Sequence, residues 1–257
     1  ASAIKEGEVK YANVPASYRF VEDNGIWTVK AATTIADGVA MVGEDEYYEI
    51  SSKAGLLWLA NEVNVNNNSF AGKTVKLAAD IDLNNQPWTP IGLNADDAKK
   101  FKGTFEGVAL TKADTYPVIR NLYVETSPGY TAAGFFGALN GTAKNFGIEN
   151  ATIKHISTGD PTDNGIAVVA GSIYNKGNIE GVTVKNATVE GNRYVGGIAG
   201  YTYGNVKNCS VENLTLKSGA TRATSSRSCA KFTLFVGLAG SFQRYESTFC
   251  PKRLTSL

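Results

Sequence analysis

The stretches AKNFGIENATI (143–153), IEGVTVKNATV (179–189) and VKNCSVENLTL (206–216) align without gaps, at offsets of 36 and 27 residues. In each copy, apolar residues alternate with polar ones, the alternation breaks at a Glu-Asn or Lys-Asn pair, and then it resumes. Alternation of period two is typical of β-strands, and asparagine is typical of a sharp bend. Each copy therefore predicts two short strands that meet at a corner.

The polar columns of this alignment carry charges of alternating sign. Two columns do so: Lys144, Glu180 and Lys207, and Glu149, Lys185 and Glu212. If the copies lie side by side in a sheet, about 4.8 Å apart, each charge faces its opposite in the next copy. The columns Asn150, Asn186, Asn213 and Thr152, Thr188, Thr215 predict side-chain ladders in the same way. A shorter copy, IRNLYVE (119–125), begins 24 residues before the first one.

A repeat of 24 to 36 residues with short strands, asparagine corners and no intervening amphipathic helix is typical of a parallel β-solenoid. Tandem β-hairpins are the alternative, but they need tight turns such as Asn-Gly, and the corners here read Glu-Asn-Ala and Lys-Asn-Ala. The sequence therefore predicts an all-β chain that stacks its repeats in order.

Three longer segments resemble the GLUG repeat of bacterial secreted and surface proteins, which include adhesins. They are AAGFFGALNGTAKNFGIENATI (132–153), VVAGSIYNKGNIEGVTVKNATV (168–189) and VGGIAGYTYGNVKNCSVENLTL (195–216). Upstream, LLWLANEVNV, FAGKTVKLAADIDLN, WTPIG and FKGTFEG are similar to the segment that precedes such repeats. The resemblance covers about residues 48–216, and it implies a right-handed parallel β-helix of the pectate-lyase type. It implies little about the ligand.

We expect three regions along the chain. Residues 1–47 predict a small β-rich spacer or the start of the solenoid, and 48–217 the GLUG-type β-helix. A helix at about 51–64, with Ser51 or Ser52 as its N-cap, is expected to cover the first coil, because solenoid ends expose apolar core. Residues 218–257 hold six Lys or Arg against one acid, and predict a C-terminal cap or an irregular basic tail.

Composition argues against several classes of partner and cofactor. A net charge of +1 gives no electrostatic footprint for nucleic acid, and the absence of a long apolar run argues against membrane insertion. The N-terminus lacks a signal-peptide pattern, so we expect a mature chain or a portion of one. Three cysteines and the single His155 show no zinc-type spacing, so neither a metal nor another cofactor is expected. Whether Cys229 and Cys250 form a disulfide stays open.

The glycine-rich stretch YVGGIAGYTYGN (194–205) poses the question of a phosphate-binding loop. Such a loop needs a following helix and a partner lysine, whereas another strand follows here. Gly200 instead matches Gly137 and Gly171, which predicts tight turns or close approach of neighbouring backbones. Asp80 and Asp82 lie two residues apart on a predicted strand and form the candidate pair for a glycosidase.

Two groups of residues are candidates for ligand binding. Tyr174 and Tyr203 occupy equivalent positions in adjacent copies, with Tyr201 nearby, and stacked rings suit sugars or simply protect a corner. His155, Asp160 and Asp163 lie in KHISTGDPTDN (154–164), which makes one repeat longer and predicts a protruding loop. That loop can bind a cation weakly or be an ordinary solvated turn.

We therefore expect a non-catalytic adhesion or ligand-presenting module on a bacterial surface or in secretion, with no catalytic residues. Its expected partner is a glycan or a host or cell-surface protein. A polysaccharide-degrading lyase or glycosidase is the alternative, since such enzymes occur on β-helices, and a rigid spacer without a ligand is the third. Cys209, in the column of Phe146 and Val182, is expected to be buried.

Overall fold

The computed structural model describes residues 17–23, 26–44, 46–93, 97–109, 115–126, 132–155, 165–191, 194–218, 231–238 and 241–248. Strands dominate this part of the chain, and they are joined by the helix α2 (Lys53–Asn64) and the short 3₁₀ helix η1 (Asp97–Lys99). The expected all-β class is thus confirmed, with most sheets built from parallel strands.

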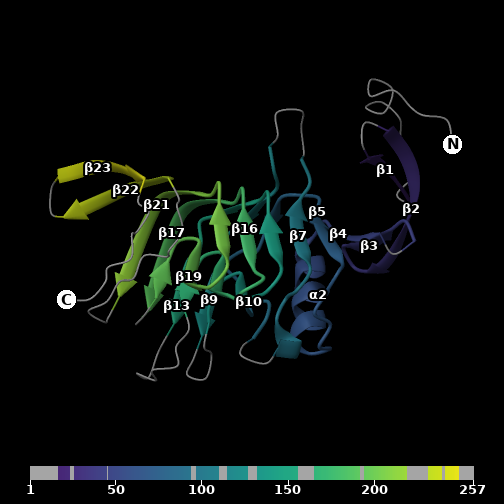
Figure 1. Ribbon diagram of the computed structural model, residues 1–257, viewed down its shortest axis with the longest axis horizontal. Helices are drawn as coiled ribbons and strands as arrows, with labels where there is room; N and C mark the ends of the chain where they lie inside the picture. The colour runs from purple at the N-terminus through teal and green to yellow at the C-terminus, as the bar shows by residue number, and fades with distance from the viewer. Residues whose placement is uncertain are drawn as a thin grey trace.

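The first sheet runs along the long axis of the molecule (Figure 1). In sheet order its strands are β1 (Tyr18–Asp23), β2 (Ile26–Ala36), β3 (Val39–Val42), β4 (Tyr47–Ile50), β5 (Thr74–Leu77), β7 (Thr104–Gly107), β11 (Thr142–Lys144), β16 (Asn178–Glu180) and β20 (Asn205–Lys207). The pairs from β1 to β4 are antiparallel, and those from β4 to β20 are parallel.

Further parallel sheets are made by the segments between these strands. The second sheet holds β10 (Phe136–Leu139), β15 (Ala170–Ile173) and β19 (Ala199–Thr202). The third holds β6 (Ile81–Asp82), β8 (Val118–Arg120), β12 (Gly147–Glu149), β17 (Thr183–Gly191), β13 (Thr152–His155) and β9 (Tyr123–Thr126), with β21 (Ser210–Ser218) paired to β17. Short strands β14 (Ile166–Ala167) and β18 (Val195–Gly196) also pair, as do the antiparallel β22 (Lys231–Leu238) and β23 (Ser241–Thr248).

The chain winds repeatedly through the three sheets, and we call each such winding a pass. Each pass adds strands to the sheets in the same order. The segment from β10 to β13 forms one pass, β14 to β17 the next, and β18 to β21 the third. The strand pairs have the predicted register, with Ala143 opposite Ile179 and Ile179 opposite Val206. The three copies found by alignment therefore do lie side by side in sequence order.

The alignment of the shorter copy 119–125 was wrong. Ile119 lies opposite Ile148, 29 residues on, and Val124 lies opposite Ile153. The shorter copy therefore corresponds to the second half of the repeat rather than to its beginning. The segment after residue 125 differs in length from the later passes, so a gapless offset of 24 placed it five residues out of register.

The corners explain why asparagine recurs. Asn121, Asn150, Asn186 and Asn213 form one corner column, each with φ between 53° and 57°. Asparagine tolerates this left-handed backbone better than other non-glycine residues do. The amides also bond to one another: Asn213 Nδ2 donates to Asn186 Oδ1 (3.0 Å), and Asn186 Nδ2 to Asn150 Oδ1 (3.4 Å). The predicted asparagine ladder is confirmed.

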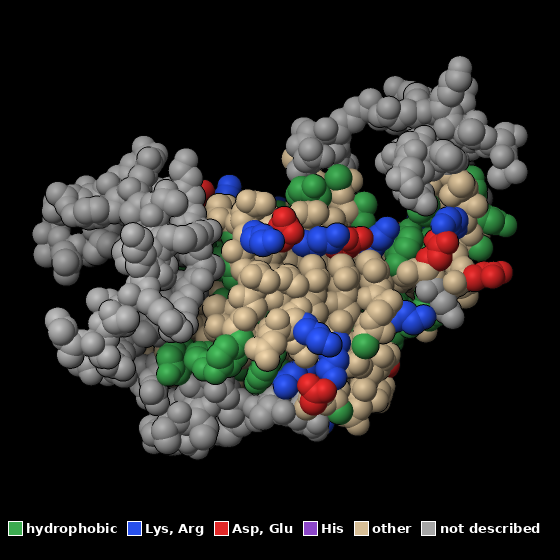
Figure 2. All heavy atoms as spheres, in the orientation of Figure 1, with side chains coloured by type: hydrophobic (Ala, Val, Ile, Leu, Met, Phe, Trp, Pro, Cys, Tyr) green, Lys and Arg blue, Asp and Glu red, His purple; other side chains and the backbone are tan. Residues whose placement is uncertain are grey.

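The predicted charge ladders are also confirmed, and they are longer than the alignment indicated. In register order, three ladders alternate in sign: Glu49, Lys76, Glu106, Lys144, Glu180 and Lys207; Asp82, Arg120, Glu149, Lys185 and Glu212; and Glu125, Lys154, Glu190 and Lys217. A row of alternating basic and acidic side chains crosses the face seen in Figure 2. Each exposed pair contributes only about 0.2–1 kcal/mol, but a shift of register would lose these pairs along the whole ladder.

The core lies between the sheets and changes in character along the chain. Aromatic rings fill its N-terminal half, with contacts from Phe70 to Phe101 (6.0 Å between ring centroids), Phe101 to Phe136 (5.4 Å) and Phe136 to Phe135 (4.9 Å). Smaller residues replace them later, as Val182 and Cys209 do in the column of Phe146, and all three are buried.

The expected helix is present at the N-terminal end of the parallel strands (Figure 1). Ser52 is its N-cap, and its Oγ accepts a hydrogen bond from the Gly55 N–H at 3.3 Å. Leu56, Leu59 and Val63 are fully buried in the main core. The helix thus covers apolar side chains at this end, as expected.

The predicted region boundaries stay predictions. β4 spans residues 47 and 48 and joins the antiparallel strands to the parallel ones, so one sheet crosses the first boundary. Ala32, Val42 and Tyr47 nevertheless form a small core of their own, separate from the main one. Cys229 and Cys250 lie outside the described residues.

Candidate functional site

One corner of the molecule presents different polar side chains on successive passes. Each of these side chains belongs to the residue that comes directly after the last paired residue of the second sheet. They are Lys102, Asn140, Tyr174 and Tyr203. The backbone N–H of Asn140 donates to Phe101 O, that of Tyr174 to Leu139 O, and that of Tyr203 to Ile173 O, at 2.8, 2.8 and 2.9 Å. The four residues therefore form one column, which we call the corner column.

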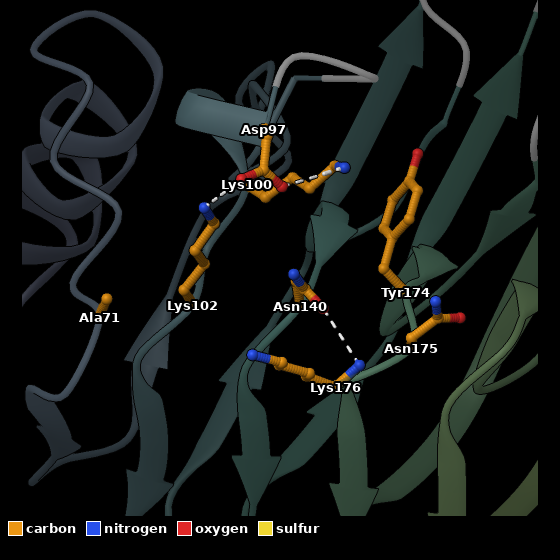
Figure 3. A pocket seen from close by; sticks show the side chains of 8 residues that line it. All are labelled: Ala71, Asp97, Lys100, Lys102, Asn140, Tyr174, Asn175 and Lys176. Carbon is orange, nitrogen blue, oxygen red and sulfur yellow. Dashed lines mark hydrogen bonds and ion pairs between the residues drawn. The ribbon is translucent and has the colours of Figure 1, made fainter.

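The corner column borders a pocket of about 530 Å³ (Figure 3). Its lining residues are Ala71, Asp97, Lys100, Lys102, Asn140, Tyr174, Asn175 and Lys176. Lys102 precedes β7, Asn140 lies between β10 and β11, and Tyr174 lies between β15 and β16. Three successive passes thus contribute to one hollow.

A two-residue insertion enlarges this corner on the pass of Tyr174. The offset between paired residues rises from 34 in the second sheet (Phe136 to Ala170) to 36 in the first sheet (Thr142 to Asn178). Asn175 and Lys176 are the extra residues, and both are exposed. The turn is fixed by its backbone, because the Lys176 N–H donates to Asn140 Oδ1 at 3.1 Å.

The insertion also corrects the interpretation of repeat length. The sequence predicts that the segment 154–164 makes the 36-residue repeat longer than its 27-residue neighbour. The offset along the chain from a position to its partner on the next pass is 36 residues at Ile153, 29 at Ile166 and 27 at Asn178. Seven of the nine additional residues therefore lie between 153 and 166, and two lie at the corner.

Charged groups in the pocket share one carboxylate. Asp97 Oδ2 lies 2.5 Å from Lys102 Nζ, and Asp97 Oδ1 lies 3.4 Å from Lys100 Nζ. The hydrogen bond from Lys102 keeps the pKa of Asp97 below its usual value, so this carboxylate is ionised at neutral pH. Figure 3 shows its side chain between the two lysines.

Tyr174 contacts a cation in this pocket. Lys100 Nζ lies 3.9 Å from the centroid of the Tyr174 ring, a cation–π distance, and burial raises the pKa of the phenol. The expected stacking of Tyr174 on Tyr203 is not among the ring contacts of the described residues. Tyr203 is instead in edge contact with Tyr201 at 5.0 Å, and their hydroxyls are 2.6 Å apart. Tyr203 is 64% exposed, which leaves most of its surface open to a ligand.

Of the predicted loop group, His155 alone lies among the described residues. His155 lies at the end of β13 and is buried, with Nδ1 2.6 Å from Thr126 Oγ1. Asp160 and Asp163 lie outside the described residues. His155 faces the interior, so its side chain does not belong to the exposed surface on which a loop site was expected.

Asp80 and Asp82 hold neighbouring backbone in place. Asp80 accepts from the Val118 N–H and from Arg120 Nη1, both at 2.9 Å, and Asp82 Oδ1 accepts from the Asn84 N–H at 2.7 Å. Partial burial raises the pKa of Asp80, but these two hydrogen bonds lower it more; for Asp82 the Asn84 bond lowers the pKa. A glycosidase pair needs one carboxyl protonated near neutral pH, and this pair does not fit that requirement.

Gly200 of the supposed phosphate loop lies in a strand, as do the two glycines that it matches. Gly137, Gly171 and Gly200 belong to β10, β15 and β19, not to a corner. A Cβ on Gly200 would lie 2.3 Å from Ile166 N, and one on Gly137 would lie 2.3 Å from Gly92 O. Of the two expectations, close backbone approach is confirmed and the tight turn is wrong.

Other groups offer little chemistry. Cys209 is buried as expected, and burial raises the pKa of its thiol. Among the described residues, no three His, Cys, Asp or Glu side chains gather as a metal site would require. No helix in the described ranges combines the length and apolarity needed to cross a bilayer.

Sequence reasoning found Tyr174 and Tyr203 but missed Lys100, Lys102 and Asn140. The two lysines precede the repeat copies that were aligned, so no column contained them. The register between copies held the signal for Lys176, because IYNKGN (173–178) is two residues longer than the equivalent TYGN (202–205).

Comparisons with known proteins support the GLUG resemblance. The family model described as the GLUG motif matches residues 191–217. Halomucin from Haloquadratum walsbyi is 33% identical over 164 residues, which cover 60% of this chain and 2% of halomucin. A crystal structure from Bacteroides ovatus, described as that of a candidate immunoglobulin A1 protease, superimposes with a TM-score of 0.41 at 22% identity, over 71% of this chain and 60% of that one. The chain carries a GLUG motif, and the first two matches fit a module of a surface or secreted protein.

Proposed function

We propose that this chain is a right-handed parallel β-helix that acts as a non-catalytic adhesion or ligand-presenting module at a cell surface or in secretion. The order of strands in the three parallel sheets supports the winding, and parallel crossover connections are right-handed in about 98% of cases. The GLUG motif and the likeness to halomucin support the surface role. The structural use of Asp80 and Asp82 favours a module without catalysis over a polysaccharide-degrading enzyme.

The ligand is a glycan that lies along the corner column. The observation that carries this proposal is the placement of Lys102, Asn140, Tyr174 and Tyr203 at one corner of successive passes, beside a pocket. Neighbouring strands are about 4.8 Å apart, so the column extends over roughly 14 Å and can contact several units of a chain-like ligand. Amide and ammonium groups bond to hydroxyls, and the exposed Tyr203 ring offers apolar surface to a sugar ring.

A glycan array tests this function, followed by calorimetry on the best ligand. Tyr203→Ala is expected to lower the affinity about tenfold, because a well-placed aromatic contact contributes on the order of 1–2 kcal/mol. Tyr123→Ala is the matched control, since it removes the same ring from β9 of the third sheet rather than from the corner column. It should bind as the unmodified protein does.

The other outcomes separate the alternative functions. A folded protein that binds no glycan on a broad array would refute the proposal and favour the rigid spacer. Binding followed by release of shortened saccharides would identify an enzyme. Equal losses in Tyr203→Ala and Tyr123→Ala would exclude the corner column as the binding surface.

A further inference from the structure

We infer that the saccharide bound at the corner pocket is acidic and carries carboxylate or sulfate groups. This inference rests on the proposed glycan-binding function and adds the charge of the ligand. It is carried by the presence of Lys100, Lys102 and Lys176 in the lining of one pocket, where Asp97 pairs with the first two.

The described lining of the pocket has an excess of positive charge. Its described lining holds three lysines and a single carboxylate, that of Asp97, which is already shared between Lys100 and Lys102. Elsewhere the same passes place opposite charges next to each other in the three ladders, so their fields largely cancel. The pocket departs from that pattern, and an anion is the ligand that it would attract.

Lys176 carries the charge that is available to a ligand. Its backbone is held on both sides, because its N–H donates to Asn140 Oδ1 and its carbonyl accepts from Asn178 Nδ2, each at 3.1 Å. Its ammonium forms no ion pair with any described residue, and the side chain is exposed. The two-residue insertion thus presents an exposed lysine on a fixed turn that lines the pocket (Figure 3).

Lys100 supplies a second, more deeply placed charge. The residue is only 8% exposed, and its ammonium lies between the Asp97 carboxylate and the face of the Tyr174 ring. Because that ring face already contacts a cation, it is not free for a sugar to stack on. The ring therefore orients the lysine, and a neutral sugar would gain little from this part of the pocket, whereas an acidic one would gain from both charges.

Paired probes that differ only in charge test the inference by isothermal calorimetry. A tetrasaccharide of glucuronic acid and its methyl ester have the same rings, and a sulfated dextran oligosaccharide and its unsulfated form provide the second pair. We expect at least one acidic probe to bind tenfold or more tightly than its neutral partner. Raising NaCl from 0.1 to 1 M shortens the Debye length from about 10 to about 3 Å and should remove most of that difference.

Substitutions locate the effect in the pocket. Lys176→Gln should weaken binding of the acidic probe about fivefold, the upper range for an exposed ion pair, and leave the neutral probe unchanged. Lys185→Gln is the control, because it removes the same charge from an exposed ladder position of the third sheet. Circular dichroism confirms that each variant is folded.

Each outcome supports or overturns the inference. Equal affinity for the charged and neutral probes, with both lost in Tyr203→Ala, would refute the acidic ligand and leave glycan binding intact. Equal weakening by Lys176→Gln and Lys185→Gln would show that net charge rather than the pocket governs binding, and would also refute it. A folded protein that binds none of the four probes refutes the acidic class, and the glycan array then decides whether the proposed function survives.

Discussion

Asn186 provides a test of why asparagine occupies the corners. It has φ of 53° within β17, and its amide links Asn150 on one neighbouring pass to Asn213 on the other. Replacing it by alanine would keep the backbone in a left-handed conformation that costs most L-residues about 1–2 kcal/mol. Two exposed amide hydrogen bonds, worth together about 0.5–1 kcal/mol, would be lost as well.

The expected loss for Asn186→Ala is therefore about 2 kcal/mol in the free energy of unfolding. Asn186→Gly removes the backbone strain and should cost only about 1 kcal/mol, through the lost amide and the greater freedom of the unfolded chain. The protein itself supplies a precedent, since Gly181 occupies the same column as Asn145 and Asn208 with φ of 63°. Asn205→Ala separates the amide from the backbone effect: it loses one amide bond of 2.9 Å at a position without positive φ, and should cost less than 1 kcal/mol.

Urea unfolding at 25 °C, followed by circular dichroism, measures these differences. With an m-value of about 3 kcal/mol/M, the midpoint for Asn186→Ala should fall by about 0.7 M. A glycine variant that is less stable than the alanine variant would refute the conformational explanation. A loss in Asn205→Ala as large as in Asn186→Ala would assign the stability to the amide ladder instead.

Two further substitutions test the packing and the pH dependence. Gly200→Ala should lower the free energy of unfolding, measured in urea, by about 3 kcal/mol, because the new Cβ would lie 2.3 Å from the backbone N of Ile166. In Gly72→Ala the new Cβ has no atom within 4 Å, so this variant should lose only about 1 kcal/mol, through its φ of 73°. Similar losses in the two variants would refute the close-approach explanation. The folded-state pKa of Asp80 is lowered, so its contribution to stability is present above the unfolded pKa of about 3.9 and is lost as the pH falls through the folded value. Urea midpoints at pH 7 and pH 3 should therefore differ less in Asp80→Asn than in the unmodified protein, and an unchanged difference would contradict this assignment.

The repeat was predictable because stacking brings the residues of one alignment column next to each other in space. Residues that lie opposite one another must be compatible in size, charge and backbone conformation. The alternating charges of Lys144, Glu180 and Lys207 and the asparagines of the corner could therefore be recognised from the alignment alone. The N-cap of the helix was predictable for a similar reason, since Ser52 acts on an N–H only three residues away.

The register of IRNLYVE was not predictable from a gapless alignment, because variable segments between the strands shift one copy against the next. The glycine strands were mistaken for corners because glycine serves turns and close backbone contacts equally well, and only the neighbouring backbone distinguishes the two.

The sequence by itself thus determined the parallel strands, the ladders and the asparagine corners, because these follow from a repeated local pattern. Only the tertiary structure decided where the proposed binding surface lies. Lys102 and Lys176 are 74 residues apart in the chain, and Asp97 and Tyr174 belong to different passes, so no local pattern connects them. They share a pocket because successive passes place the same corner side by side, and a two-residue insertion adds a charge there.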